Sequence, residues 1–357
     1  MSFKINNNIV IDANGVVIPS FTTGTRPGNA VNGQIIYNLS TNLMEIYDTG
    51  LWKDALSNAS GGAFLYRQII TTGYVMGGYQ NTSPWKNVNK MVHATDVMTN
   101  LGDLLSFAGA YTSGFCSTTR GYLWSADNSW PGTSTQTVAF NLATETGAGT
   151  NTNWNMSVTR DDSATGFKEQ SYAYITAGGN SAIDIFTAAT ETMSAGANGA
   201  GITGDGQQSG GASFSSETAA YYWGNESKKL TFGSGTAYTI ASTSVGGSGS
   251  QHKGISTKIG KGYCGNDGSY NGGYNLRRWN TATDTQNTTC SKPIGNSGEE
   301  NLDMGQAYQY MMGMYDGAQN NRGWKFNYNT ETGYELGAGS VRTGVPGGSS
   351  GHCVWKG

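Results

Sequence analysis

Neighbouring carboxylates are the residues of this chain best suited to catalysis. Asp161 and Asp162 are adjacent, and Glu299 and Glu300 are followed by Asp303. Two carboxylates can act as general acid and base, or as acid and nucleophile, in glycoside hydrolysis. No G-x-S-x-G elbow or other nucleophile, base or cofactor motif accompanies them. The sequence therefore predicts a protein that is not an enzyme, with hydrolysis as the alternative.

Metal and phosphate sites also lack a supporting motif. The glycine-rich stretches at 246–253 and 260–262 do not have GxxxxGK[ST] spacing. The only histidines are His93, His252 and His352. His93 occupies an aromatic position of the repeat described below, which favours packing over metal ligation. The cysteines are widely spaced, without a C-x-x-C pair, and we predict buried free thiols: Cys116, Cys264, Cys290 and Cys353. We expect no cofactor and no metal.

Composition restricts the partners and the fold class. Charged residues make up 13% of the 357 residues, and the net charge of −3 comes without a Lys/Arg cluster, which argues against nucleic acid. No apolar run reaches the roughly 18 residues that span a bilayer, and the N-terminus has no signal-peptide pattern. We expect synthesis in a cytoplasm without a signal. The 54 glycines and 11% aromatics predict many short strands and tight turns.

An aromatic-first heptamer recurs six times along the chain. Its first positions are His93, Phe140, Phe186, Phe232, Trp279 and Phe326, separated by 47, 46, 46, 47 and 47 residues. An aromatic-rich strand precedes each heptamer, and a Gly/Ser/Thr-rich stretch ends each unit. A fixed period in this range indicates a tandem array.

Three to four short strands per unit predict an all-β fold, a six-bladed β-propeller over residues 64–357. A solenoid could have the same period but needs polar capping repeats, and the last unit ends on His352-Cys353-Val354-Trp355. That favours a closed ring, in which we expect a strand near residues 65–70 to complete the final blade. Residues 56–63 are small and polar and predict a linker.

The repeat resembles the kelch-type propeller. Gly77-Gly78 and Gly178-Gly179 match its double glycine, and a Thr-acid-Thr sequence matches its T-x-T turn at 144–146, 190–192, 283–285 and 330–332. Most units lack the double glycine and the tryptophan that follows the turn. Residues 125–133 are similar to the sialidase box, with Ser129 in place of its central glycine. That likeness gives the hydrolase alternative its substrate class, a surface glycan.

Residues 1–55 form a separate N-terminal element. Asn14-Gly15 interrupts an apolar run and predicts a β-hairpin. Arg26-Pro27, the Gly33–Asn38 stretch, Glu45-Ile46-Tyr47 and Gly50-Leu51-Trp52 resemble a hairpin element of tailed-bacteriophage fibre and other virion proteins. So small an element makes a poor independent core, and antiparallel pairing is needed for its aromatics to share a face. Our docking candidates are Arg26, Tyr37, Tyr47 and Trp52.

These likenesses imply a bacteriophage virion structural protein, such as a tail fibre component. We expect the N-terminal element to dock onto the particle and the propeller to bind a host-surface glycan or protein, or other virion proteins. We expect multiple copies, homo-oligomers included, and no insertion into a membrane. The alternatives are a capsid or tail decoration protein without receptor binding and a sialidase-like hydrolase of surface glycans.

Overall fold

The computed structural model contains almost no helix and divides the chain into two compact units, Met1–Arg67 and Gln68–Gly357. It describes residues 3–5, 9–12, 15–40, 43–48, 51–54, 72–77, 79–80, 83–84, 86–92, 95–109, 113–124, 134–160, 164–168, 170–176, 182–196, 212–216, 218–223, 227–236, 238–242, 257–258, 261–265, 275–281, 283–291, 298–303, 308–314, 323–327, 330–336 and 351–355. The expected linker at 56–63 lies outside these ranges. Within them, no helix has the length and apolar character needed to cross a bilayer.

The smaller unit begins with a three-stranded antiparallel sheet. Its strands are β1 (Phe3–Ile5), β2 (Ile9–Asp12) and β3 (Gly15–Val17). β2 pairs antiparallel with β3, with Asp12 opposite Gly15. The predicted hairpin is confirmed.

A four-stranded sheet follows, and the 3-10 helix η1 (Thr23–Thr25) lies between its first two strands along the chain. Its strands are β4 (Ser20–Phe21), β5 (Ile35–Asn38), β6 (Leu43–Asp48) and β7 (Leu51–Asp54). β4 runs parallel to β5, whereas the β5–β6 and β6–β7 pairs are antiparallel. The register places Tyr47 opposite Trp52 and Tyr37 opposite Met44, so Tyr37 lies on the other face of the sheet.

The larger unit contains six four-stranded antiparallel sheets, here called sheets I to VI in the order in which the chain enters them. Sheet I has β8 (Thr72–Met76), β11 (Asn87–Val92), β12 (Val97–Asp103) and β33 (Gly351–Trp355); sheet II has β13 (Gly114–Cys116), β14 (Arg120–Trp124), β15 (Thr137–Asn141) and β16 (Thr146–Thr150). Sheet III has β17 (Ala164–Lys168), β18 (Tyr172–Thr176), β19 (Asp184–Thr187) and β20 (Thr192–Ala195); sheet IV has β21 (Ala212–Ser215), β22 (Ala219–Trp223), β23 (Ser227–Phe232) and β24 (Tyr238–Ser242). Sheet V has β25 (Thr257–Lys258), β26 (Lys261–Gly265), β27 (Asn275–Asn280) and β28 (Thr285–Ser291); sheet VI has β29 (Gly298–Asp303), β30 (Tyr308–Met314), β31 (Gly323–Asn327) and β32 (Thr332–Glu335). The remaining described elements are the hairpin β9 (Tyr79–Gln80) and β10 (Ser83–Pro84) and the 3-10 helix η2 (Thr152–Trp154).

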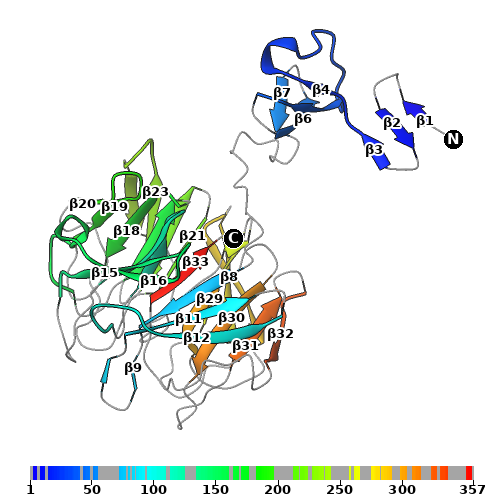
Figure 1. Ribbon diagram of the computed structural model, residues 1–357. Coiled ribbons are helices and arrows are strands. Elements are labelled where there is room, and N and C mark those ends of the chain that lie inside the picture. The colour runs from blue at the N-terminus through cyan, green and yellow to red at the C-terminus, as the bar shows by residue number, and fades with distance from the viewer. Residues whose placement is uncertain are drawn as a thin grey trace. The chain divides into compact units, whose positions relative to one another are not determined.

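The two ends of this unit meet in sheet I, opposite to the expected arrangement. β33 at the C-terminus pairs antiparallel with β8, with Gly351 opposite Met76 and Trp355 opposite Thr72 (Figure 1). Among the described strands, sheet VI is formed by four strands of one continuous segment; the expected closing strand near residues 65–70 lies outside the described ranges. The physical reason for the pairing of β33 with β8 is that β33 follows the last full sheet, and its unpaired backbone groups find partners on the open edge of β8.

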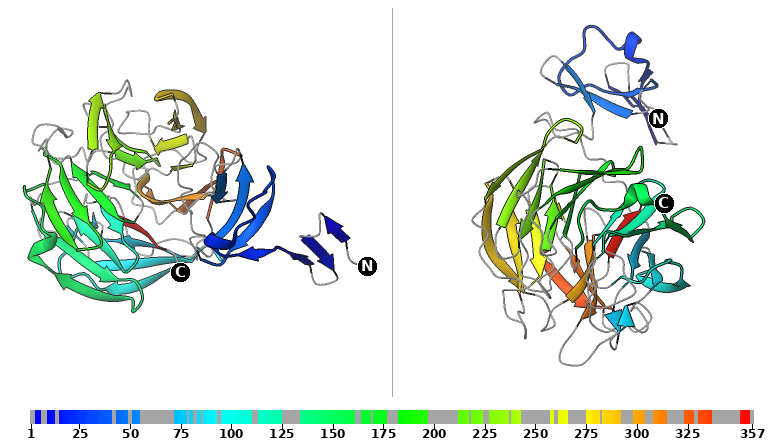
Figure 2. Two further views of the ribbon diagram at one scale, coloured as in Figure 1. Left: turned by 90° about the horizontal axis from the view of Figure 1, so that it is seen from above. Right: turned by 90° about the vertical axis from the view of Figure 1, so that its left-hand side faces the viewer.

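Neighbouring sheets contact one another in a cyclic order. β13 contacts β33 and β17, β17 contacts β21 and β22, β21 contacts β26, and β28 contacts β32. β29 of sheet VI then contacts β33 and β8 of sheet I. Figure 2 shows these sheets from two further directions.

The core lies between the sheets. One cluster joins Tyr74 and Val88 of sheet I to Leu123 and Phe140 of sheet II. Equivalent clusters lie between sheets II and III and between sheets III and IV. Burial on both faces explains why the aromatic-rich second strands read as almost continuous apolar runs.

Candidate functional site: the polar ring between the sheets

The turn between the third and fourth strands of each sheet carries one residue in the left-handed backbone region. That residue is an acid in five of the six turns, with φ between 51° and 56°. The acids are Asp96, Glu145, Glu191, Asp284 and Glu331. In sheet IV the position is Gly235, with φ of 58°. A side chain in this region costs of order 1 kcal/mol, and these acids are the only non-glycine residues with positive φ in the described ranges.

Threonines flank most of these acids, as the T-x-T motif implies. Their hydroxyls lie 2.7 Å apart in four turns. The pairs are Thr144–Thr146, Thr190–Thr192, Thr283–Thr285 and Thr330–Thr332. The side-chain contact joins the two residues that flank the acid.

Each acid binds a cation of the preceding sheet. Asp284 binds Lys229 at 2.7 Å, and Glu331 binds Arg278 at 2.7 Å. Lys90 pairs with Glu145 and Arg120 with Glu191 in the same way. Lys325 of sheet VI binds Asp96 of sheet I at 2.7 Å, although 229 residues separate them. We call this set of five ion pairs the polar ring.

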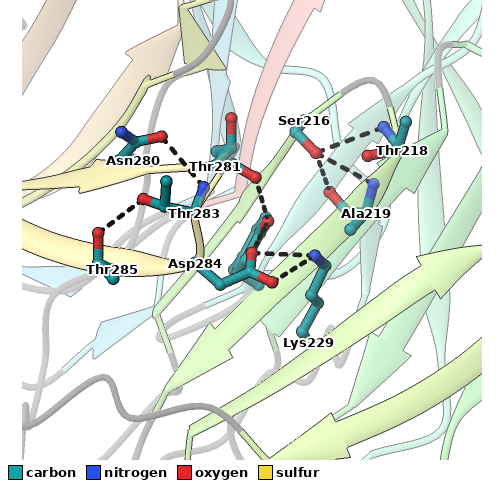
Figure 3. A network of polar contacts seen from close by, with 10 residues as sticks. Ser216, Thr218, Ala219, Lys229, Asn280, Thr281, Thr283, Asp284 and Thr285 are labelled. Carbon is teal, nitrogen blue, oxygen red and sulfur yellow. Dashed lines mark hydrogen bonds and ion pairs between the residues drawn. The ribbon is translucent and has the colours of Figure 1, made fainter.

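A tyrosine on the second strand completes three of the junctions. The hydroxyls of Tyr74, Tyr122 and Tyr221 donate to Glu145, Glu191 and Asp284 at 2.9, 3.1 and 2.7 Å. Figure 3 shows Lys229 reaching Asp284 in the junction between sheets IV and V.

Burial dominates the electrostatics of these tyrosines. It raises the pKa of Tyr74, Tyr122 and Tyr221 well above the ordinary value, and the adjacent carboxylate raises each further. Burial alone would raise the pKa of Asp284, but hydrogen bonds from Lys229 and Tyr221 bring it below its usual range. The tyrosines stay protonated as donors, and the acid stays charged.

The junction between sheets III and IV departs from this pattern. Gly235 offers no carboxylate, and Lys168 donates instead to the backbone oxygen of Gly233 at 2.7 Å. The hydroxyl of Tyr174 is buried and has no hydrogen-bond partner among the described residues. The Tyr174 ring stacks on Phe232 with centroids 5.3 Å apart, and burial raises its pKa to about 12.

Four of the predicted repeat anchors occupy equivalent buried positions. Phe140, Phe186, Trp279 and Phe326 are at most 3% exposed. Each is the residue five positions before the left-handed acid. The same count leads to Met91 in sheet I and Leu230 in sheet IV, both fully buried.

In sheets I and IV the equivalent position is held by Met91 and Leu230 and not by the predicted anchors. The register sets Met91 opposite Gly73 and Leu230 opposite Ala220, as it sets Phe140 opposite Gly121. Phe232 lies two residues beyond Leu230 and is half-buried. His93 lies outside the described residues. The aromatic-first pattern does not include these positions, because Met91 and Leu230 are apolar but not aromatic.

The docking candidates of the smaller unit are engaged within it. Arg26 donates to both oxygens of Glu45, at 2.8 and 2.5 Å, and Asn38 donates to Glu45 at 3.0 Å. Asn38 is fully buried and Glu45 is 5% exposed. Tyr47 and Trp52 pack edge to face at 5.3 Å. The motif residues thus build the polar and aromatic interior of this unit; Tyr37 is half-buried on the other face.

The remaining candidates have different outcomes. Asp161 and Asp162 lie outside the described residues, as does His252. Glu299, Glu300 and Asp303 lie on β29 and His352 on β33, without described side chains. Among the side chains that are described, no group of three or more His, Cys, Asp or Glu could hold a metal. Cys116 is disulfide-bonded, so the prediction of a free thiol is wrong there.

One buried ion pair was not expected from the sequence. Arg160 donates to Asp184 at 2.9 Å and to the backbone oxygen of Ala182 at 2.9 Å, and neither charged side chain is exposed. Asp184 also accepts from the backbone of Ser157 at 2.9 Å. Burial lowers the pKa of Arg160. With both charges enclosed and paired with each other, the ion pair ties β19 to the preceding segment.

The geometry of the polar ring is suited to holding neighbouring sheets together. Every carboxylate in it already accepts from a cation, and three also accept from a tyrosine, so each is committed to joining two sheets. Neither a comparison with models of protein families nor a search of curated proteins finds a match to this chain.

Proposed function

We propose that the larger unit is a six-bladed, kelch-like β-propeller, with sheets I to VI as its blades. The observation that supports this most is the ion pair between Lys325 and Asp96, which joins the last sheet to the first. The cyclic order of sheet contacts and the pairing of β33 with β8 support the same closure. Such a ring leaves only short, protected sheet edges and presents loops on a fixed frame.

We further propose that the protein is a non-enzymatic structural protein of a tailed-bacteriophage virion. Its division into two compact units supports separate roles in attachment and recognition. The residues that carry the virion-hairpin likeness, Arg26, Asn38 and Glu45, form one hydrogen-bonded cluster, so the likeness extends to residues that determine the fold of this unit. The smaller unit docks onto the particle.

The propeller binds outward, to a host-surface glycan or protein or to neighbouring virion proteins. Aromatic and small polar residues in loops provide contact area and adaptable hydrogen bonds at low entropic cost. The polar ring supports this role because it joins the blades through strand residues and the short turns between the third and fourth strands.

Two preparations test the proposal. Mass spectrometry of purified virions should detect the chain, and a fragment of residues 68–357 should bind host cells while a fragment of residues 1–67 binds only particles that lack the protein. If the larger fragment assembles on particles and never binds cells, the role is decoration. Absence of the chain from virions would refute the virion assignment.

A further inference from the structure

The disulfide at Cys116 has three candidate partners. The chain has four cysteines, and Cys116 ends strand β13 of sheet II. The other three lie on described strands: Cys264 on β26, Cys290 on β28 and Cys353 on β33. A disulfide joins residues whose Cα atoms are less than about 7 Å apart, so strand placement restricts the choice.

Strand contacts favour one partner. β26 and β28 belong to sheet V, and the sheets that β13 contacts are I and III. Sheet V in turn contacts sheets IV and VI. β33 is a direct neighbour of β13, and it carries Cys353 near its middle. We infer that Cys116 is bonded to Cys353, so that the closing strand is tied covalently to sheet II.

This bond would reinforce the join where the two ends of the larger unit meet. Backbone hydrogen bonds hold β33 to β8 of sheet I, whereas the disulfide would fasten it to a different sheet. β33 would then be held from two sides. The enclosed segment, residues 116 to 353, includes nearly the whole larger unit, so the bond would limit unfolding from its terminal strand.

The chemistry gives the closure a redox dependence. The two thiols lose two protons and two electrons as the S–S bond forms, and a small-molecule disulfide such as oxidised glutathione accepts them and becomes two thiols. A reducing cytoplasm disfavours the bond, whereas an oxidising medium favours it. We therefore expect closure by backbone pairing first and covalent locking after release from the cell.

Peptide mapping of the full chain tests the pairing. Protease digestion of the oxidised protein, with thiols blocked, should yield one disulfide-linked peptide pair that contains Cys116 and Cys353. Thiol titration of the denatured, unreduced chain should find two free thiols, because Cys264 and Cys290 lie on β26 and β28, which β27 separates by about 9–10 Å, too far for a disulfide. A linkage of Cys116 to Cys264 or Cys290, or four free thiols, would overturn the inference.

Thermal denaturation tests the consequence. Reduction should lower the Tm of the larger unit by about 5–10 °C. Cys116→Ser and Cys353→Ser should each remove the effect of reductant, and Cys290→Ser should retain it. Persistence of the full reductant effect in Cys353→Ser would contradict the pairing. If a variant does not fold, the peptide map of the unaltered chain still decides.

Discussion

Removal of the acid at the first turn is expected to destabilise the larger unit more than removal of any equivalent acid. The change is Asp96→Asn, which deletes the charge that faces Lys325. Asparagine tolerates the left-handed backbone of this position, with φ of 54°, so the turn is kept. The perturbation is therefore confined to the electrostatics of one junction.

The expected magnitude depends on the burial of the cation. The Lys325 side chain is 9% exposed, whereas the other four cations of the polar ring are 21–30% exposed. An enclosed charge that loses its partner costs about 3 kcal/mol. A more exposed pair costs about 1 kcal/mol, because water solvates the remaining charge. Asp96→Asn should thus lower the free energy of unfolding by about 3 kcal/mol and the matched control Asp284→Asn by about 1 kcal/mol.

Urea unfolding of the full chain at pH 7, followed by tryptophan fluorescence, measures both variants. The double variant Asp96→Asn with Lys325→Met should recover much of the lost stability, since no buried charge is then left unpaired. Equal destabilisation by Asp96→Asn and Asp284→Asn would refute the argument. So would a double variant less stable than Asp96→Asn alone.

Three further predictions concern other buried polar groups. Stability should fall as pH rises above about 10, by up to about 1.4 kcal/mol per pH unit for each buried tyrosine, because the unfolded chain releases protons that the folded chain retains; alkaline unfolding at fixed urea measures this, and a flat profile would contradict it. The tyrosines concerned are Tyr74, Tyr122, Tyr174, Tyr221 and Tyr222. Tyr174→Phe should be nearly neutral, whereas Tyr122→Phe should cost about 1–2 kcal/mol, since only the second removes a hydrogen bond to a carboxylate; equal costs in urea titrations would be evidence against this reading. Glu45→Gln should destabilise the smaller unit by about 1–2 kcal/mol, because half-buried Arg26 loses a bidentate partner, and hydrogen exchange confined to residues 18–54 should reveal it; unchanged exchange would count against a stabilising role for this cluster.

The fold class was accessible from the sequence because turn chemistry and strand content repeat locally. The hairpin at Asn14-Gly15 and the aromatic-rich second strands lie where the pattern predicts. The pairing of β33 with sheet I could not be predicted, because a local sequence pattern does not specify which sheet edge a terminal strand will join. The same limit applies to the disulfide of Cys116, since the spacing of cysteines carries no connectivity.

The positions of the buried anchors show which part of the sequence repeat the structure follows more strictly. The evenly spaced aromatics identify the buried anchor in four sheets. In all six sheets, the buried anchor lies five residues before the left-handed turn residue, which is Gly235 in sheet IV and an acid in the others. Turn geometry is therefore the stricter repeat, because the backbone conformation must be reproduced, whereas any apolar side chain can fill the core. The turns of sheets I and IV, Thr95-Asp96-Val97 and Ser234-Gly235-Thr236, lack the Thr-acid-Thr sequence, so the motif alone does not lead to Met91 and Leu230.

The polar ring explains why an acid is retained in a conformation that disfavours it. Four of its pairs join residues 53 to 71 positions apart, which is the reach from one sheet to the next. The fifth joins Lys325 to Asp96 across 229 positions. In an open array of the same units, these two residues would lie at opposite ends and could not form this ion pair. Because the pair forms only where the last sheet meets the first, the effect of Asp96→Asn reports on closure directly.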